Sequence, residues 1–201
     1  MELQRTPEWF MGRCGKITAS SMYKVMASKT TAVYKNYLME IALEQLTNRP
    51  TESYTNPAMQ WGVDNEPLAR MAYELHTGNT LKQVGMIQHE TLLVGASPDD
   101  EVNDDGLAEY KCPNTATHIN TLMTEKVPTE YVYQMQTQIW IDKKVWCDFV
   151  SYDPRLIGKS QLFIKRVNRD DAMIAKIEQR CIEFLDEVNQ IVKRIEEING
   201  V

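Results

Sequence analysis

The 201-residue chain is long enough for one globular domain with a sizeable core, and its apolar and charged content is ordinary. The net charge of −6 excludes a generic polycation that would coat nucleic acid. The charge is uneven, however, because residues 1–50 carry a net +3 and the remainder carries −9. Any contact with nucleic acid is therefore expected to use a local basic lining rather than the whole surface.

The four cysteines, at positions 14, 112, 147 and 181, form no CxxC pair, which argues against a structural zinc site. Reduced, mostly buried thiols in a cytoplasmic protein are expected instead. The start of the chain has no apolar signal-like stretch, and no run approaches a membrane span. We therefore expect a single domain over residues 1–201 with no membrane association.

The N-terminal region places Trp9 shortly before Arg13, and residues 17–21 predict the start of a helix with Thr18 or Ser20 as its N-cap. The N-terminus of a helix beside an arginine can bind an anion. Ordinary helix capping explains the same residues without any ligand, so both interpretations stand at this point.

Two helices are predicted next. Residues 31–47 have an amphipathic pattern, with an apolar side formed by Val33, Tyr37, Leu38, Ile41 and Leu46. After a polar loop, Asn56-Pro57 predicts the N-cap and first residue of a second helix, which ends near Gly78. Glu66 lies between two apolar turns of that helix, so its carboxylate faces either solvent or a site.

Residues 80–88 predict a strand, and two further strands are predicted over 92–96 and 107–113 as a hairpin-like pair. The polar turn between them, residues 100–106, is rich in Asp, Asn and Gly. In such a pair Asp99 lies near the end of one strand, while Glu109 and Lys111 share a face of the other. These three side chains are therefore expected to converge.

This cluster suits phosphodiester hydrolysis. Two carboxylates and a main-chain carbonyl, such as that of Tyr110, form the all-oxygen ligand set that Mg²⁺ prefers. The metal would activate a water molecule, and Lys111 would position that water or stabilise the oxyanion. The pattern is loose, so a surface turn with an ion pair on one strand remains the alternative.

The C-terminal half predicts helices over 115–122 and 129–141, strands over 145–150 and 162–167, and a long helix over 170–199. Gln134 and Gln138 share a face of the second helix. The apolar stripe of the long helix is expected to pack on the sheet, with a seam against another subunit as the alternative. The order of elements predicts a mixed central sheet flanked by helices, α/β or α+β.

These residues together resemble the phage lambda exonuclease family, also called YqaJ-like viral recombinases, within the PD-(D/E)xK nuclease superfamily. The similarity covers most of the chain, and four motifs occur in the family's order. The matching segments are Trp9 with Arg13 to Ser20, Trp61-Gly62 with Glu66, Ser97-Pro98-Asp99 with Glu109-Tyr110-Lys111-Cys112-Pro113, and Gln134-Met135-Gln136. Tyr152-Asp153-Pro154-Arg155 resembles a further segment of the family.

The resemblance implies a role for each matched residue. Asp99, Glu109 and the Tyr110 carbonyl would bind Mg²⁺, for which Mn²⁺ would substitute, and Glu66 would hold a metal-bound water or a second ion. Lys111, helped by Gln134, would orient the attacking water. The 5′-terminal phosphate of the digested strand would be bound by a second group, and two further residues would contact DNA. The residues that would bind this phosphate are Arg13, Ser20 and Ser97. The two further residues that would contact DNA are Trp9 and Met59.

The resemblance also implies a restriction-endonuclease-like fold and processive digestion of one strand of duplex DNA from the 5′ end, leaving a 3′ single-stranded tail. Relatives form a homotrimeric ring around a tapered channel and work with a single-strand annealing protein in phage recombination. Such a ring would let an acidic chain line a channel with its basic residues. The expected location is the cytoplasm of a bacterial host.

Two alternatives stay open. Another nuclease of the superfamily is the first, although an iron–sulfur member would need clustered cysteines near its C-terminus, where this chain has only Cys181 in the last fifty residues. An endonuclease of the superfamily would cut a closed circle. The second is a non-catalytic DNA-end-binding protein that has kept the fold, which the full set of active-site residue types disfavours.

Overall fold

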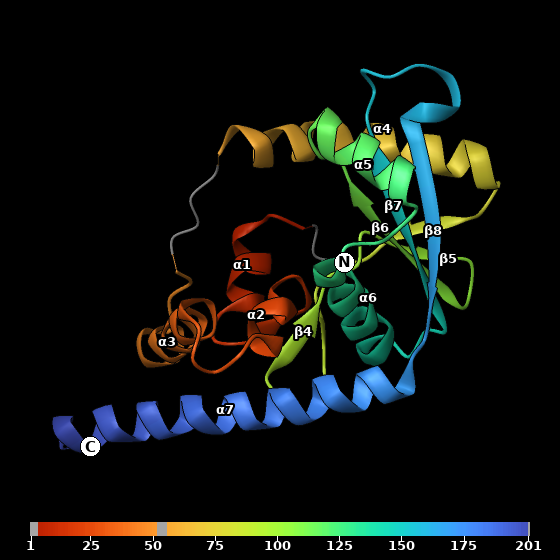
Figure 1. The fold of residues 1–201 in the computed structure, drawn as a ribbon. Helices are drawn as coiled ribbons and strands as arrows, with labels where there is room; N and C mark the ends of the chain where they lie inside the picture. Colours follow the sequence, from red (N-terminus) through yellow and green to blue (C-terminus); the bar gives the residue numbers. More distant parts are fainter. Residues whose placement is uncertain (1–3, 52–55, 201) are drawn as a thin grey trace.

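A computed structural model describes residues 4–51 and 56–200, and it has a mixed α/β architecture (Figure 1). Its larger sheet has five strands in the order β2-β5-β6-β7-β8. These strands are β2 (Leu81–Gln83), β5 (Asp100–Val102), β6 (Gly106–Lys111), β7 (Trp146–Tyr152) and β8 (Leu162–Asn168). The expected mixed sheet flanked by helices is thereby confirmed.

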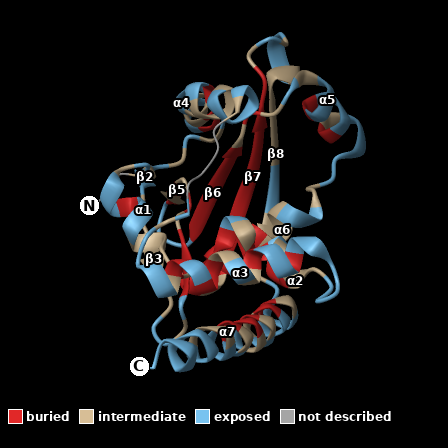
Figure 2. Ribbon diagram, turned by 90° about the vertical axis from the view of Figure 1, so that its left-hand side faces the viewer, coloured by how far each residue is buried: buried red, intermediate tan, exposed pale blue. Residues whose placement is uncertain are grey.

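The two central strands, β6 and β7, are parallel, and the other pairings in this sheet are antiparallel. Figure 2 shows both central strands as buried over nearly their whole length. Strands that are covered on both faces favour a continuous apolar run over strict alternation. Polar side chains on β6 therefore lie in the interior unless a cavity reaches them.

A smaller sheet has the strand order β1-β4-β3. Strand β1 (Ile17–Thr18) is parallel to β4 (Val94–Ala96), and β3 (Ile87–Gln88) is antiparallel to β4. Gly95 on β4 is closely packed, because a Cβ there would lie 2.0 Å from the terminal methyl of Met86, which would have to move, and 3.1 Å from the Ile87 carbonyl oxygen. Strand β4 leads directly into Ser97 and so connects the small sheet to the larger one.

Seven α-helices and two 3₁₀ turns accompany the sheets within the described ranges. The helices are α1 (Pro7–Arg13), α2 (Met22–Met26), α3 (Ala32–Thr47), α4 (Pro57–Thr77), α5 (Thr115–Thr124), α6 (Thr129–Ile141) and α7 (Asp171–Asn199), and the 3₁₀ turns are η1 (Ala19–Ser21) and η2 (Gly158–Gln161). Asn56 caps α4 by accepting a hydrogen bond from the Met59 N–H, as predicted. The left-handed Gly78 ends the same helix.

The long helix α7 packs mainly on helices rather than on the larger sheet, which corrects the sequence-based expectation. Figures 1 and 2 show it running beneath α2 and α3 with its buried side toward them. Phe184 lies 5.2 Å from Tyr34 and 5.5 Å from Tyr37 between ring centroids. Ile174, in the first turn, joins the core beside the larger sheet. The last part of the stripe is exposed, including Ile198, so a seam against another subunit stays a prediction.

Four local predictions were wrong in whole or in part. The strand expected over 80–88 is two strands, β2 and β3, which belong to different sheets. The hairpin partner of β6 is β5, inside the segment expected to be a turn, and not β4. The helix start predicted at 17–21 is partly right: β1 is followed by η1, with Thr18 at its N-cap position but without a side-chain cap hydrogen bond, and α2 begins only at Met22 with Ser21 as its N-cap. Val33 and Leu46 of α3 are exposed, whereas Tyr34 is buried.

In the described part of the chain, no helix has the length and apolar character that crossing a membrane requires. The four cysteines are unpaired, and all except the partly exposed Cys14 are buried, as expected. Part of the polar loop predicted before Asn56, residues 52–55, lies outside the described residues.

Candidate active site

A polar cavity of about 170 Å³ opens beside the end of β6, where the small sheet meets the larger one. Side chains from α1, η1, α4, β6 and α6 line it, together with the segment that joins β4 to β5. The lining residues are Gln4, Arg5, Trp9, Arg13, Ala19, Ser20, Glu66, Ser97, Asp99, Glu109, Tyr110, Lys111, Gln134 and Gln138. The structure therefore places every predicted site residue except Met59 around one cavity.

Glu109 is the most enclosed of the three acidic residues that line the cavity, at 3% exposed. Its Oε1 accepts hydrogen bonds from Lys111 Nζ and from Gln134 Nε2, each 2.6 Å long. Its Oε2 accepts one from Gln138 Nε2, also over 2.6 Å. A buried carboxylate needs such partners to stay ionised. Alternation along β6 brings Glu109 and Lys111 to the same face, as predicted.

Asp99 lies between β4 and β5, and its Oδ2 accepts a hydrogen bond of 2.7 Å from the Tyr110 main-chain N–H. Burial, followed by the negative charges of Glu109 and Glu66, raises the pKa of Asp99 well above its usual range. Lys111 and the Tyr110 N–H oppose this shift. The ionised form of Asp99 is therefore disfavoured by burial and by the two neighbouring carboxylates, and a nearby cation would favour it.

Lys111 is held between this acidic group and an aromatic ring. Burial alone would lower its pKa, but Glu109 and Asp99 outweigh burial and raise the pKa, which keeps the ammonium charged. Its Nζ also lies 4.9 Å from the centre of the Tyr131 ring, within the range of a cation–π contact. The ammonium is therefore fixed in position at the cavity.

Glu66 projects from α4 toward the same cavity, where Arg5 Nη2 donates to its Oε2 over 2.6 Å. The preceding residue, Gln4, donates from Nε2 to the main-chain oxygens of Pro98 (2.8 Å) and Val84 (3.0 Å). The start of the described chain is thus attached to both carboxylate-bearing segments, α4 and the residues around Asp99.

A second group of side chains lies on the α1 side of the cavity. Arg13 Nη2 donates to Ser20 Oγ over 3.2 Å, and the Arg13 guanidinium lies 4.2 Å from the centre of the Trp9 ring. Trp9 Nε1 donates to Ser97 Oγ over 3.0 Å. Burial lowers the pKa of Arg13, and the nearby Glu44 and Glu109 carboxylates oppose that shift. A fork of N–H donors beside two hydroxyls matches a phosphate group.

The oxygen atoms of the site are of the type that a hard divalent cation prefers. Within residues 4–51 and 56–200, no three His, Cys, Asp or Glu side chains converge closely enough to hold an ion by themselves. Two carboxylates, Asp99 and Glu109, and the neighbouring Tyr110 carbonyl are nevertheless available. The raised pKa of Asp99 identifies negative charge that a cation would neutralise. The donor chemistry therefore fits Mg²⁺ with several waters retained.

Four residues that line the cavity were not predicted as site residues: Gln4, Arg5, Ala19 and Gln138. One predicted residue, Met59, lies elsewhere. Gln138 could have been predicted, because it lies one turn after Gln134 on the same helix face. Nothing in the sequence signalled Arg5, whose place depends on a long-range contact with Glu66 of α4. Met59 is 51% exposed and lines an adjoining cavity of about 490 Å³ rather than the site itself.

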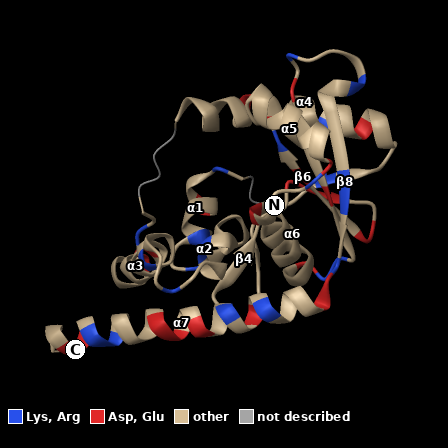
Figure 3. Ribbon diagram, in the orientation of Figure 1, with Lys and Arg blue, Asp and Glu red and all other residues tan. Residues whose placement is uncertain are grey.

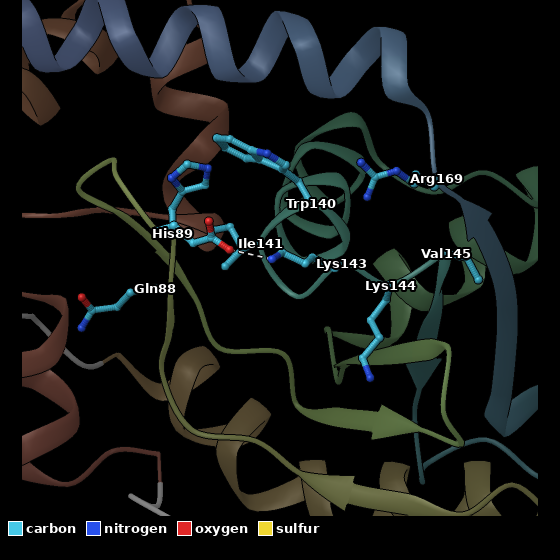
Figure 4. A pocket seen from close by; sticks show the side chains of 9 residues that line it. Gln88, His89, Trp140, Ile141, Lys143, Lys144, Val145 and Arg169 are labelled. Carbon is cyan, nitrogen blue, oxygen red and sulfur yellow. Dashed lines mark hydrogen bonds and ion pairs between the residues drawn. The ribbon is translucent and has the colours of Figure 1, made fainter.

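The charged residues are intermixed over the fold, since Figure 3 shows both signs along α7 and on the larger sheet. The cationic residues of the cavity, Arg5, Arg13 and Lys111, therefore form a local lining. Figure 4 shows a different cavity, of about 480 Å³, near the end of α6, where His89 lies beside Trp140 and Lys143 pairs with Glu90. It has one carboxylate residue in its lining and no catalytic pair.

A carboxylate ahead of β5 and a Glu-x-Lys sequence on β6, meeting beside a helical glutamate, define the site of a PD-(D/E)xK nuclease fold. Comparisons with known proteins agree. The family model described as "YqaJ-like viral recombinase domain" matches residues 8–144 of this chain. The chain belongs to the YqaJ-like viral recombinase family.

The solved structures include an alkaline exonuclease, LHK-Exo, from Laribacter hongkongensis. It shares 44% sequence identity with a TM-score of 0.92, over 97% of this chain and 98% of that one. The same exonuclease in complex with dAMP matches at 45% identity, with the same TM-score and coverage. A phage-related exonuclease from Haemophilus somnus 129PT, at 18% identity and a TM-score of 0.72 over 90% of this chain and 96% of that one, shares the fold. A comparison with curated proteins gave no match.

Proposed function

We infer that this chain is an enzyme of the DNA exonuclease class, and we propose that it is Mg²⁺-dependent and digests one strand of duplex DNA in the 5′-to-3′ direction. The observation that carries the proposal is a single cavity with two halves. Glu109, Asp99 and Lys111 form one group in its lining, and Arg13 with Ser20 and Ser97 forms a second. A chemical centre beside a phosphate-binding group is what removal of a terminal nucleotide requires.

In the proposed reaction, water attacks the phosphorus that joins the first and second nucleotides, and the bond to the 3′ oxygen of the first nucleotide breaks. That oxygen takes up a proton, and a 5′-mononucleotide leaves. LHK-Exo has been solved with dAMP, a molecule of this kind. Asp99, Glu109 and the Tyr110 carbonyl would hold the Mg²⁺, which supplies activation of water and charge neutralisation when bound. Mn²⁺ would substitute for it.

The protein's own groups orient the reaction. Lys111, anchored by Glu109 and Tyr131, would hold the attacking water and stabilise charge on the phosphate. Gln134 and Gln138 fix the carboxylate of Glu109, and Glu66 would accept a hydrogen bond from a water on the opposite side. Each group acts by positioning, because phosphoryl transfer demands mainly alignment and electrostatic stabilisation.

The second group of side chains in the cavity supports the proposed polarity. A terminal 5′ phosphate carries more negative charge than an internal phosphodiester and has more free oxygens. Arg13, Ser20 and Ser97 would bind that terminal phosphate by charge-assisted hydrogen bonds, so the strand would be fed from its 5′ end. The remaining strand would be left as a 3′ single-stranded tail for phage-type recombination.

We further propose that the working enzyme is a homotrimeric ring with a single-strand annealing protein as its partner in a bacterial cytoplasm. The family resemblance supports this proposal. Three cationic residues, Arg5, Arg13 and Lys111, line the cavity beside three acidic ones, so contacts to DNA phosphates would be made by a few local cations and not by the whole acidic surface. Sedimentation or light scattering would give the mass of the assembly, and a monomer of fully active enzyme would contradict the ring.

A time course on linear duplex DNA with one 5′ end blocked tests polarity and product together. The proposal expects Mg²⁺-dependent release of 5′-mononucleotides from the open end only, with a 3′ tail growing there. Release from the blocked end's 3′ terminus would contradict the polarity. Covalently closed plasmid should stay intact, and cutting of that circle would favour an endonuclease. No turnover with Mg²⁺ or Mn²⁺ would favour a DNA-end-binding protein.

A further inference from the structure

The segment around Arg5 is held in an unusual conformation. Arg5 has a φ of 68°, in the left-handed region that side chains other than glycine rarely adopt. The residues on both sides are fixed, because Gln4 donates to the Pro98 and Val84 carbonyl oxygens and Thr6 Oγ1 accepts from the Trp9 N–H that begins α1. Left-handed backbone at a residue with a long side chain persists only when its surroundings impose it. The hydrogen bonds of the flanking residues Gln4 and Thr6 therefore hold Arg5 in this conformation.

The place that Arg5 occupies is a boundary between two cavities. Arg5, Trp9 and Arg13 line both the catalytic cavity of about 170 Å³ and the adjoining cavity of about 490 Å³. The adjoining cavity is bordered by α1, α3 and the start of α4. A strand leaving the catalytic cavity on this side would pass Arg5. Arg13 belongs to the proposed terminal-phosphate group, so a second phosphate on this side would need another cation, which Arg5 could supply by exchanging Glu66 for it.

The present partner of Arg5 is easily exchanged. Its Nη2 lies 2.6 Å from Glu66 Oε2, and the two side chains are 45% and 30% exposed. Ion pairs that are open to solvent contribute little net stability, so a phosphodiester could replace Glu66 at small cost. Glu66 would then be released to bind water at the catalytic cavity. One exchange would thus prepare both residues for the substrate.

We propose that Arg5 binds an internal phosphodiester of the strand being digested, separate from the terminal phosphate at Arg13, and that Glu66 occupies it while DNA is absent. This inference rests on the proposed function. The planar fork of arginine suits a phosphodiester, and a charge-assisted bond of this kind is stronger than a neutral one. The contact is to the backbone, so it is independent of base sequence.

The test compares Arg5→Ala, Arg5→Lys and Arg13→Ala with Arg194→Ala, a matched control at an exposed arginine on α7. Digestion of linear duplex with 5′-phosphate or 5′-hydroxyl ends is measured over a series of salt concentrations. Arg5→Ala should raise KM about tenfold or more on both kinds of end. It should also reduce the slope of log KM against log salt concentration by about one, the loss of one released counterion. Arg5→Lys should restore part of the loss. Arg13→Ala should instead change the ratio between the two kinds of end.

A second pair of variants tests whether Arg5 acts by binding DNA or only by holding the Glu66 side chain in place. In a Glu66→Gln background, where the ion pair no longer exists, adding Arg5→Ala should still weaken equilibrium binding of duplex ends in Ca²⁺ about tenfold. Equal affinity of the single and double variants would overturn the inference, as would an unchanged KM and salt dependence in Arg5→Ala. Inactive wild-type protein would instead contradict the proposed function, so the two failures are distinguishable.

Discussion

Gln138 Nε2 donates a hydrogen bond of 2.6 Å to Glu109 Oε2, and Gln134 Nε2 donates one of 2.6 Å to the other carboxylate oxygen, Oε1. The two glutamines lie one turn apart on α6, and each binds a different oxygen of one carboxylate. Gln138 itself is fully buried. Each oxygen of the buried Glu109 carboxylate thereby accepts a hydrogen bond from the same rigid helix, which fixes the rotation of the carboxylate.

Replacement of Gln138 by leucine should lower kcat about 10- to 100-fold with KM nearly unchanged. The loss removes a charge-assisted bond to Glu109 and leaves the carboxylate free to rotate. Steady-state digestion of a linear duplex measures both constants. Gln136→Leu is the matched control, because Gln136 lies on the same helix but bonds to Asn168 and Asp170. A fall in kcat as large in the control would contradict a positioning role for Gln138.

Asp99→Ala and Lys111→Ala should each abolish digestion, by about 10³-fold or more, and leave folding and DNA binding largely intact. Both side chains reach a solvent-accessible cavity and act in the proposed chemical step. Turnover of radiolabelled duplex measures the first effect, and circular dichroism with a binding assay measures the second. Normal turnover in either variant would refute the catalytic assignment.

Arg13→Ala should act selectively on substrates that carry a 5′ phosphate. The guanidinium and Ser20 form part of the proposed terminal-phosphate group, so its removal should reduce kcat/KM about 10- to 100-fold on phosphorylated ends. On 5′-hydroxyl ends the loss should be much smaller. An equal loss on both kinds of end would show that Arg13 serves some other purpose.

The sequence predicted most of the fold because local signals were strong at many places. The stretch Asn56-Pro57 began α4 as expected, and the periodicity over 129–141 matched α6. The errors occurred where short segments change sheets. Strand β5 was hidden in a run of turn residues, since only three residues pair and Asp100 is stabilised by tertiary contacts rather than by strand propensity.

The site was predictable to the extent that its residues share an element or a motif. Glu109 and Lys111 follow from strand alternation, and Gln138 follows from helix spacing. Arg5 could not be predicted, because its contact with Glu66 spans 61 positions and depends on a left-handed turn with no glycine to indicate it. Long-range contacts of single side chains leave no periodic signal.

Arg70 should be a structural requirement of the site. Its Nε donates to Asp100 Oδ2 over 2.7 Å, and the Tyr110 hydroxyl donates to the same oxygen over 2.9 Å. Asp100 is fully buried, so Arg70→Leu would leave a buried carboxylate without its cation. We expect a loss of about 2–4 kcal/mol in the free energy of unfolding, measured with urea.

The double variant Arg70→Leu with Asp100→Asn supplies the control for that prediction. Removing the carboxylate charge together with its cation should restore at least half of the lost stability, because the buried charge is then gone. A double variant no more stable than Arg70→Leu alone would show that packing of the arginine side chain, rather than its charge, causes the loss.

Asp153 should make stability depend on pH in the acid range. Burial alone would raise its pKa, but hydrogen bonds from Arg155 and Thr115 outweigh burial and lower the pKa of Asp153 to about 2. Because the folded-state pKa lies below the unfolded value, the stabilisation is full above the unfolded pKa of about 4 and disappears as pH falls toward 2. Since Arg155 is 43% exposed, we expect on the order of 1 kcal/mol.

Urea unfolding of wild type and Asp153→Asn between pH 2.5 and 7 measures this contribution. The wild type should be more stable at pH 7, and the difference should shrink steadily below pH 4. Glu197→Gln is the matched control, because its ion pair with Arg194 is exposed on both sides and should contribute little at any pH. A difference for Asp153→Asn that stayed constant down to pH 2.5 would mean that lost packing, and not the ionised carboxylate, accounts for the effect.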